Sequence, residues 1–562
     1  MRKAIAGAAR PSGGGASQKP LSTAATTLLS PVRGLSGFRA HPRLTPWVGL
    51  SRRFAPEIGP VALTMALLFS LLSCSQPPDP NTLVMIIESS PTNLDPRVGI
   101  DAQSERIDSL IFDDLLDRDE HLNVTPALAE TWQIPDPLTY IFHIRRGVRF
   151  HDGRALTARD VKWTFDSLLQ GKIRTTRAAA YRYVDHIEAP DDYTVVFHLK
   201  QPFSTLLWNL SDGAMGIVPY GSLTEMTSQP IGSGPFRFVS AEPDKEVILE
   251  RNDGYWGDKA RVRRLRFTVV PDTTTRALEL RKGSADVASN ALTSDMVLAL
   301  EKEPNLEVEH APGTVLAYLA FNLRDPILGD VRVRQALAYA IDRRPMIQYL
   351  WREFAQPAAN ILPPQSWAYN PNVPKYEYSP DKANKILDDA GYPATEGVRF
   401  HLTMKTSTEE TTRLTVAVLQ QQLRAVGIVL DVRTFEFGTF FADVTSGAYQ
   451  MYCCLRWVGS NEDPDIFEYA FHSDKFPPHG ANRSFYVNPR LDAHINQGRS
   501  ETDLGRRKDI YDEVQTILAT DLPYIDLWFL DNVLVHTKRV RNIHLNPSGN
   551  YDFLKTAEIS GQ

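Results

Sequence analysis

Cysteine is scarce in this chain, with three residues among 562. Cys453 and Cys454 are adjacent, and a disulfide between neighbouring residues is strained and rare, so we expect both to pack as small apolar side chains in a strand. The 13 histidines show no H-x-H or H-E-x-x-H pattern, and no cysteine–histidine spacing typical of a metal site occurs. The sequence therefore predicts neither a disulfide framework nor a bound metal or cofactor.

Apolar runs long enough to cross a bilayer are also missing. Residues 58–73 hold an apolar core of about 15 residues, too short for a membrane span and typical of a signal-peptide h-region. Arg52 and Arg53 precede this run, which ends at Ser73 and Cys74. The ending resembles the lipobox of a bacterial lipoprotein, which implies cleavage before Cys74, a lipid on its sulfur, and a location in the periplasm or at the cell surface. An uncleaved anchor or a buried apolar helix is the alternative.

The first 50 residues lack an apolar period. They are rich in Gly, Ala, Ser, Pro and Arg, and a stretch of this composition cannot bury a core. We therefore interpret residues 1–73 as a leader with a long N-terminal extension, and residues 74–80 as the linker to the lipid anchor.

An excess of positive charge is absent as well. The chain has 61 basic and 67 acidic residues, a net charge of −6. Nine of the basic residues and one acidic residue lie in 1–73, so the remainder has 52 basic and 66 acidic residues, a net charge of −14. This balance argues against nucleic acid as a partner and against a polybasic membrane patch.

What is present after the leader is a mixed α/β pattern. Residues 83–87 read as a buried strand, and Thr157 is expected to cap a helix with Asp160 at the capping-box position. Residues 399–405, 409–426 and 428–435 read as strand, helix and strand, which predicts a βαβ unit with parallel strands. Roughly 490 residues are too many for one core, so we expect two or more lobes.

Several motifs together resemble one protein family. They are RGVRFHDGRALTARDVKWTFD at 146–166, IGSGPFRF at 231–238, ERNDGYWG at 250–257, VVPDTTTR at 269–276, LRKGSAD at 280–286 and DVRVRQALAYAIDR at 330–343. They are similar to motifs of the extracytoplasmic solute-binding proteins of ABC importers, in the family 5 class that includes oligopeptide-, dipeptide- and nickel-binding members. The resemblance covers nearly all of residues 81–540.

The resemblance implies a two-lobe, periplasmic-binding-protein-like fold that closes on its ligand about a hinge. Lobe one would comprise residues 81–310 and 525–562, with an extra subdomain at about 128–227. Lobe two would comprise residues 311–524. The solute would lie in the cleft between the lobes.

One candidate binding segment is residues 456–465. In peptide-binding relatives an aromatic residue here is followed, three residues later, by an aspartate that pairs with the ligand's α-ammonium; this chain has Trp457 and then Ser460. A neutral hydroxyl cannot replace that charge, so peptides with a free N-terminus are in doubt. Glu462 or Asp463 could supply the charge from a shifted position, and we include Asn461 and Asp463 as candidates. For Trp457 core packing is the alternative, and for Asp463 it is the N-cap of a helix with Pro at its first position.

A second candidate segment is the loop after the first strand, residues 88–95. The resemblance implies that this loop lines the cleft, and Ser89, Ser90 and Asn93 offer hydroxyl and amide groups to a solute. A plain turn is the alternative. From lobe two we add Asn322, next to the apolar stretch 318–321.

Three functional classes remain open. The leading one is a lipid-anchored, monomeric receptor that delivers a peptide or peptide-like solute to the permease and ATPase subunits of an ABC importer. A sensor of the same fold, or a receptor for a sugar or metal chelate, is the alternative. The absence of a G-x-S-x-G motif and of a metal constellation argues against an enzyme. Any transport role requires partner subunits, since the chain has no membrane-spanning stretch of its own.

Overall fold

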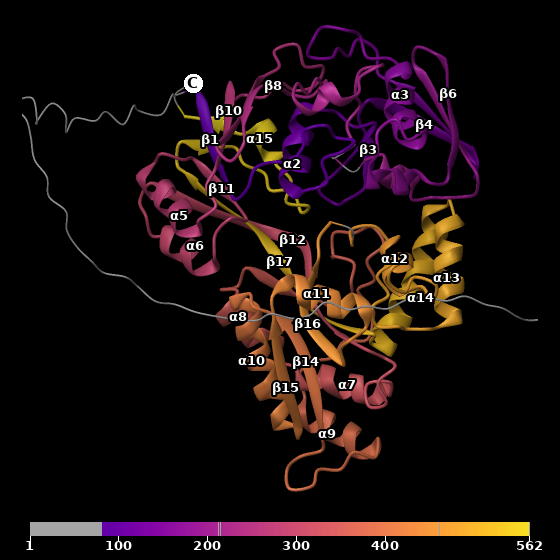
Figure 1. The fold of residues 1–562 in the computed structure, drawn as a ribbon, viewed down its shortest axis with the longest axis vertical. Coiled ribbons are helices and arrows are strands. Elements are labelled where there is room, and N and C mark those ends of the chain that lie inside the picture. The colour runs from indigo at the N-terminus through magenta and orange to yellow at the C-terminus, as the bar shows by residue number, and fades with distance from the viewer. Residues whose placement is uncertain (1–80, 212, 214, 460, 561–562) are drawn as a thin grey trace, which may run out of the picture. The chain divides into compact units, whose positions relative to one another are not determined.

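The computed structural model describes residues 81–211, 213, 215–459 and 461–560, all within one compact unit, Gln76–Gln562 (Figure 1). The predicted leader 1–73, the linker 74–80 and the lipidation site Cys74 lie outside the described residues. In the described part, no helix is both long and apolar enough to cross a membrane.

The largest element is an 11-stranded mixed sheet. It contains parallel pairs, such as β1 with β10 and β14 with β15, beside antiparallel ones, such as β12 with β17. Its order is β15 (Ile428–Phe435), β14 (Phe400–Ser407), β16 (Met451–Trp457), β12 (Leu306–Phe321), β17 (Tyr524–Thr537), β11 (Val287–Ser289), β1 (Thr82–Ile87), β10 (Arg264–Val269), β9 (Glu246–Arg251) and β8 (Phe236–Glu242), with β13 (Ala355–Pro357) paired to β17.

Two long strands, β12 and β17, connect the two halves of this sheet and run side by side in Figure 1. Their register shifts between Ala311 and Val315. Gly313 lies at this shift, where a Cβ atom would sit 2.5 Å from the main-chain oxygen of Leu530. A residue without a side chain is therefore needed for the two strands to approach here.

A separate four-stranded antiparallel sheet forms within residues 129–199. Its order is β4 (Ala129–Asp136), β5 (Thr139–Ile144), β7 (Thr194–Leu199) and β6 (Val184–Asp191), and α3 (Ala158–Leu169) packs against it. The predicted capping box is confirmed, because the Asp160 carboxylate accepts hydrogen bonds from the main-chain nitrogen and the hydroxyl of Thr157. The sheet has its own hydrophobic core, which includes Tyr140, Phe142 and Phe197.

Helices cover the strands of the C-terminal half. The predicted βαβ unit is confirmed as β14, α10 (Glu410–Ala425) and β15, with β14 and β15 parallel. The packing of this half falls into two hydrophobic clusters, which draw mainly on residues 316–529. The other helices here are α7 (Val331–Ala340), α8 (Arg343–Leu350), α9 (Pro380–Asp389), α11 (Phe437–Ser446), α12 (Ile466–Phe471), α13 (Pro489–Ser500) and α14 (Leu504–Asp521).

The N-terminal half and the C-terminal tail share a further core. It joins β1, β9 and β10 to residues near the C-terminus such as Tyr551 and Phe553. The remaining elements are the helices α2 (Ala102–Ile111), α4 (Leu206–Asn209), α5 (Thr273–Lys282), α6 (Ser294–Leu300) and α15 (Phe553–Thr556), the 3-10 turns Thr176–Tyr181 and Thr224–Thr227, and the strand pairs β2 (Leu116–Arg118) with β3 (Val124–Pro126) and β18 (Val540–Arg541) with β19 (Glu558–Ile559).

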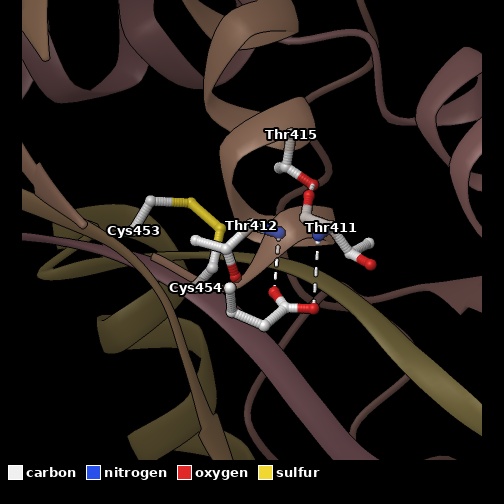
Figure 2. The surroundings of a disulfide bond; sticks show 6 residues. Thr411, Thr412, Thr415, Cys453 and Cys454 are labelled. Carbon is white, nitrogen blue, oxygen red and sulfur yellow. Dashed lines mark hydrogen bonds between the residues drawn. A yellow bond between two sulfur atoms is a disulfide. The ribbon is translucent and has the colours of Figure 1, made fainter. Parts of the chain in front are cut away.

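The expectation for the adjacent cysteines needs a correction. Cys453 and Cys454 lie in strand β16, as predicted, but they form a disulfide (Figure 2). The register against β12 passes from Leu455 opposite Tyr318 to Cys453 opposite Leu319, so Cys454 is the extra residue of a bulge, with a φ of 74°. Neighbouring side chains of a regular strand point to opposite faces, and the bulge removes this obstacle to a bond between them.

Candidate functional site

Trp457, at the end of β16, lies against a group of aromatic rings. Its indole stacks on Tyr318 with ring centroids 5.9 Å apart and meets the edge of Tyr469 at 6.3 Å. The guanidinium of Arg483 lies over the indole, 5.5 Å from its centroid. Only 6% of Trp457 is exposed, and its Nε1 has no hydrogen-bond partner among the described residues. Trp457 is thus a core residue whose one polar atom is left available.

Hydrogen bonds of Asn461 hold the loop after Trp457 in place. Ser460 lies outside the described residues. The Asn461 side chain is fully buried, and its Nδ2 donates to the main-chain oxygens of Thr314 at 2.9 Å and Ile361 at 3.1 Å. These bonds hold the loop against β12 and against the segment that follows β13.

Asp463 stabilises the turn that leads into α12. Its Oδ1 accepts from the main-chain nitrogen of Asp465 at 2.8 Å and lies 3.9 Å from Arg507. Burial raises the pKa of Asp463 to about 6, and Arg507 opposes this rise. Asp465 occupies the N-cap position of α12, so the helix starts two residues later than the sequence predicts, although the main-chain oxygen of Asp463 already accepts from the nitrogen of Ile466.

Glu462 links distant parts of the chain at the same loop. Its carboxylate accepts from the Thr314 hydroxyl at 2.7 Å and forms an ion pair with Arg118 at 3.1 Å. The Arg118 guanidinium in turn lies 3.7 Å from the ring centroid of Trp208. The three acidic residues within 462–465 can be recognised in the sequence, but the partner of Glu462, 344 residues away, cannot.

The loop after β1 is held by hydrogen bonds both within the loop and to a distant segment. Ser90 Oγ accepts from the main-chain nitrogen of Asp244 at 2.7 Å, and Asn93 Oδ1 accepts from the main-chain nitrogen of Asp95 at 2.9 Å. Ser89 is exposed at the tip. These three predicted residues therefore form a group of their own beside β1.

Asn322 occupies a third place, at the far end of β12. Its Nδ2 donates to the main-chain oxygens of Gly447 at 3.2 Å and Tyr449 at 2.9 Å, and its Oδ1 accepts from Arg324. The structure therefore brings Trp457, Asn461 and Asp463 together in one loop, and places Asn322 and the β1 loop elsewhere.

A cavity that the sequence analysis missed opens beside the start of β17. It has a volume of about 580 Å³ and aromatic walls from Tyr369, Tyr376 and Phe467. Two of its oxygens, Asp526 Oδ1 and Asn360 Oδ1, are buried and have no hydrogen-bond partner among the described residues. Burial raises the pKa of Asp526 to about 7, and the positive charge of Arg343 opposes this rise. The lining comes from five separate segments, so no local pattern in the sequence predicts the cavity.

Comparison with known proteins agrees with the predicted family. The family model described as bacterial extracellular solute-binding proteins, family 5 Middle, matches residues 123–477. The dipeptide-binding protein of Escherichia coli is 27% identical over 505 residues, which cover 84% of this chain and 94% of that protein. A glutathione-binding protein of Pectobacterium atrosepticum is 29% identical over 482 residues, with 84% and 93% covered.

Solved structures show the same fold. The structure of HbpA2 from Haemophilus parasuis matches with a TM-score of 0.77 at 26% identity, covering 85% of this chain and 100% of that one. The mixed α/β, two-lobed fold expected from the sequence is thereby confirmed. Because the family model spans more than half of the chain, this protein belongs to the bacterial extracellular solute-binding proteins of family 5.

Proposed function

We propose that this protein is the receptor of an ABC importer for a peptide or peptide-like solute, which it binds between its lobes and delivers to a permease and an ATPase. The observation that carries the proposal is the alignment with a dipeptide-binding protein over 94% of that protein's length. In this role the chain is a monomeric binding protein and not an enzyme.

The loop 457–465 is the proposed contact with the solute. Arg118 and Glu462 connect it to the N-terminal half of the chain, so a solute beside it can touch both halves. The proposed contacts remain Trp457, Ser460, Asn461 and Asp463, with Ser89, Ser90, Asn93 and Asn322 from the other two places.

The charge beside Trp457 bears on the kind of solute. Ser460 supplies no carboxylate, and Arg483 has no carboxylate within ion-pair distance among the described residues. The charge that lies over the indole face is therefore the positive guanidinium of Arg483. A carboxylate or carbonyl group of the solute suits this surface better than a free ammonium group.

Native mass spectrometry of the protein purified from the periplasm of an expressing cell tests this function. We expect a co-purified peptide-like mass that is lost on denaturation, and tight, reversible binding of the same compound by calorimetry without turnover. A co-purified haem, sugar or metal chelate, or a thermal-shift screen in which no di- or tripeptide binds, would contradict the peptide assignment.

The anchor is tested on the full chain. We propose that the leader 1–73 is removed and that Cys74 carries the lipid, so the protein should fractionate with membranes and a Cys74→Ser variant should be released into the soluble fraction. A Cys453→Ser variant controls for the loss of a cysteine as such. Membrane retention of the Cys74→Ser variant would contradict lipid anchoring.

A further inference from the structure

The hairpin of β6 and β7 carries two histidines and a glutamate on one face. His186 and Glu188 are two residues apart on β6 and so point to the same side of the sheet. His198, on β7, is the direct cross-strand partner of His186. Nine residues separate Glu188 from His198 in the sequence, which is why the three do not form a recognisable motif before the hairpin pairs them.

The three side chains converge on a small volume. His186 Nε2 lies 3.5 Å from one oxygen of Glu188, and His198 Nε2 lies 3.7 Å from the other. The two imidazoles stack with centroids 4.4 Å apart, and one ligand atom from each residue lies within 4.8 Å of the others. Two ligands of one tetrahedral zinc ion, each about 2.0–2.2 Å from it, lie roughly 3.3–3.5 Å apart. The two histidine–carboxylate separations are close to that spacing, each to a different oxygen of Glu188, and they are too long for strong hydrogen bonds.

The hydrogen bonds around the two imidazole rings leave Nε2 of His186 and Nε2 of His198 available to bind a metal ion. Asp185 lies 2.9 Å from Nδ1 of His186, which favours a proton on Nδ1 and a lone pair on Nε2. Nε2 of His198 is buried and has no hydrogen-bond partner in the described chain. A carboxylate behind a histidine ligand is the usual outer partner in metal sites.

We propose that His186, Glu188 and His198 form a binding site for a divalent transition-metal ion of the zinc type. Two imidazole nitrogens and one carboxylate oxygen suit this ion class, with water in the fourth position. The bound ion would fasten β6, which is an edge strand of the four-stranded sheet, to its neighbour β7. None of these residues belongs to the loop proposed to contact the solute, so the site is independent of the transported compound.

Calorimetry of the chelator-treated protein with zinc chloride tests the site. We expect saturable binding of one ion, at least tenfold weaker in His186→Gln and in His198→Gln, with a rise in melting temperature on zinc addition that both variants lose. His121→Gln is the matched control, because His121 also has a glutamate, Glu120, at 3.7 Å but belongs to no three-ligand cluster among the described residues. Circular dichroism without metal checks that each variant folds, and Glu188→Gln provides a third variant at an exposed position.

A spectroscopic measurement identifies the ligands directly. Copper(II) binds such sites more tightly than zinc, and its electron paramagnetic resonance spectrum should show coupling to two nitrogens in the wild-type protein and to one in either histidine variant. The proposal is overturned if the wild-type protein binds no zinc, or if His121→Gln weakens binding as much as His186→Gln does.

Discussion

The indole of Trp457 stacks on Tyr318 and meets Tyr469 at its edge, and 6% of the residue is exposed. Such a ring cannot be removed without a loss of stability. We expect Trp457→Ala to lower the free energy of unfolding by about 3–5 kcal/mol, measured by urea titration. Trp457→Phe keeps a flat aromatic ring and should lower this free energy much less. Equal stability of the two variants would show that the ring does not pack in the core. Trp457→Phe is consequently the variant in which solute affinity should be compared.

We propose that Ser460 stands at the position that the family resemblance assigns to an aspartate in peptide-binding relatives. We expect Ser460→Asp to strengthen binding of a dipeptide with a free N-terminus by about 1.5–3 kcal/mol, the value of a hydrogen bond to a charged group. The same dipeptide with an acetylated N-terminus should gain nothing in calorimetry. Ser446→Asp, at an exposed residue of α11, controls for added negative charge. A gain in affinity for both peptides, or for neither, would show that residue 460 does not face the ammonium group of the ligand.

Asp526 makes stability depend on pH. Burial raises its pKa from 3.8 to about 7, so between these values the folded state binds more protons than the unfolded chain. Stability from this group therefore falls as pH rises from about 4 to 7. We expect Asp526→Asn, which cannot ionise, to be more stabilising relative to wild type at pH 8 than at pH 4 in urea titrations. Asp509→Asn, at an exposed residue, is the matched control for the substitution itself. A pH-independent effect of Asp526→Asn would contradict the raised pKa.

At the scale of elements, local patterns predicted the helices and strands whose signals lie within a few residues. The βαβ unit around α10 follows from apolar periodicity, and the start of α3 follows from Thr157 and Asp160. The pairing of β12 with β17 could not be predicted in this way, because more than 200 residues separate the two strands. The cavity beside Asp526 and the ion pair of Arg118 with Glu462 could not be predicted for the same reason.

The disulfide in β16 shows how an element can change residue chemistry. A regular strand turns Cys453 and Cys454 to opposite faces, and only the bulge opposite Tyr318 and Leu319 permits their bond. We expect iodoacetamide to label neither cysteine in the denatured, unreduced protein and to label both after reduction, as read by peptide mass spectrometry. Labelling of both without reduction would restore the expectation of two free thiols. The labelling of Cys74, where a lipid is proposed, serves as the internal comparison for the labelling of Cys453 and Cys454.

At the scale of the whole molecule, binding and hinge closure should be linked. The long strands β12 and β17 connect the two halves of the chain, and the register shift near Gly313 marks a point where their pairing is interrupted. We expect a hinge here, since few main-chain hydrogen bonds must change for the strands to bend. A solute that contacts both halves would then favour the closed arrangement.

Ligand-driven closure has a thermodynamic and a structural consequence. A solute that binds only the folded protein, at 100 times its Kd, adds about 2.7 kcal/mol to the free energy of unfolding, and closure should lower the radius of gyration measured by small-angle scattering. The same experiment with Trp457→Phe at equal fractional saturation should show the same compaction, because a weaker site still closes when filled. Stabilisation without compaction would mean that the solute binds within one half, and the cavity beside Asp526 would then be its site. Asp526→Asn separates these outcomes, since it should weaken binding only in the second case.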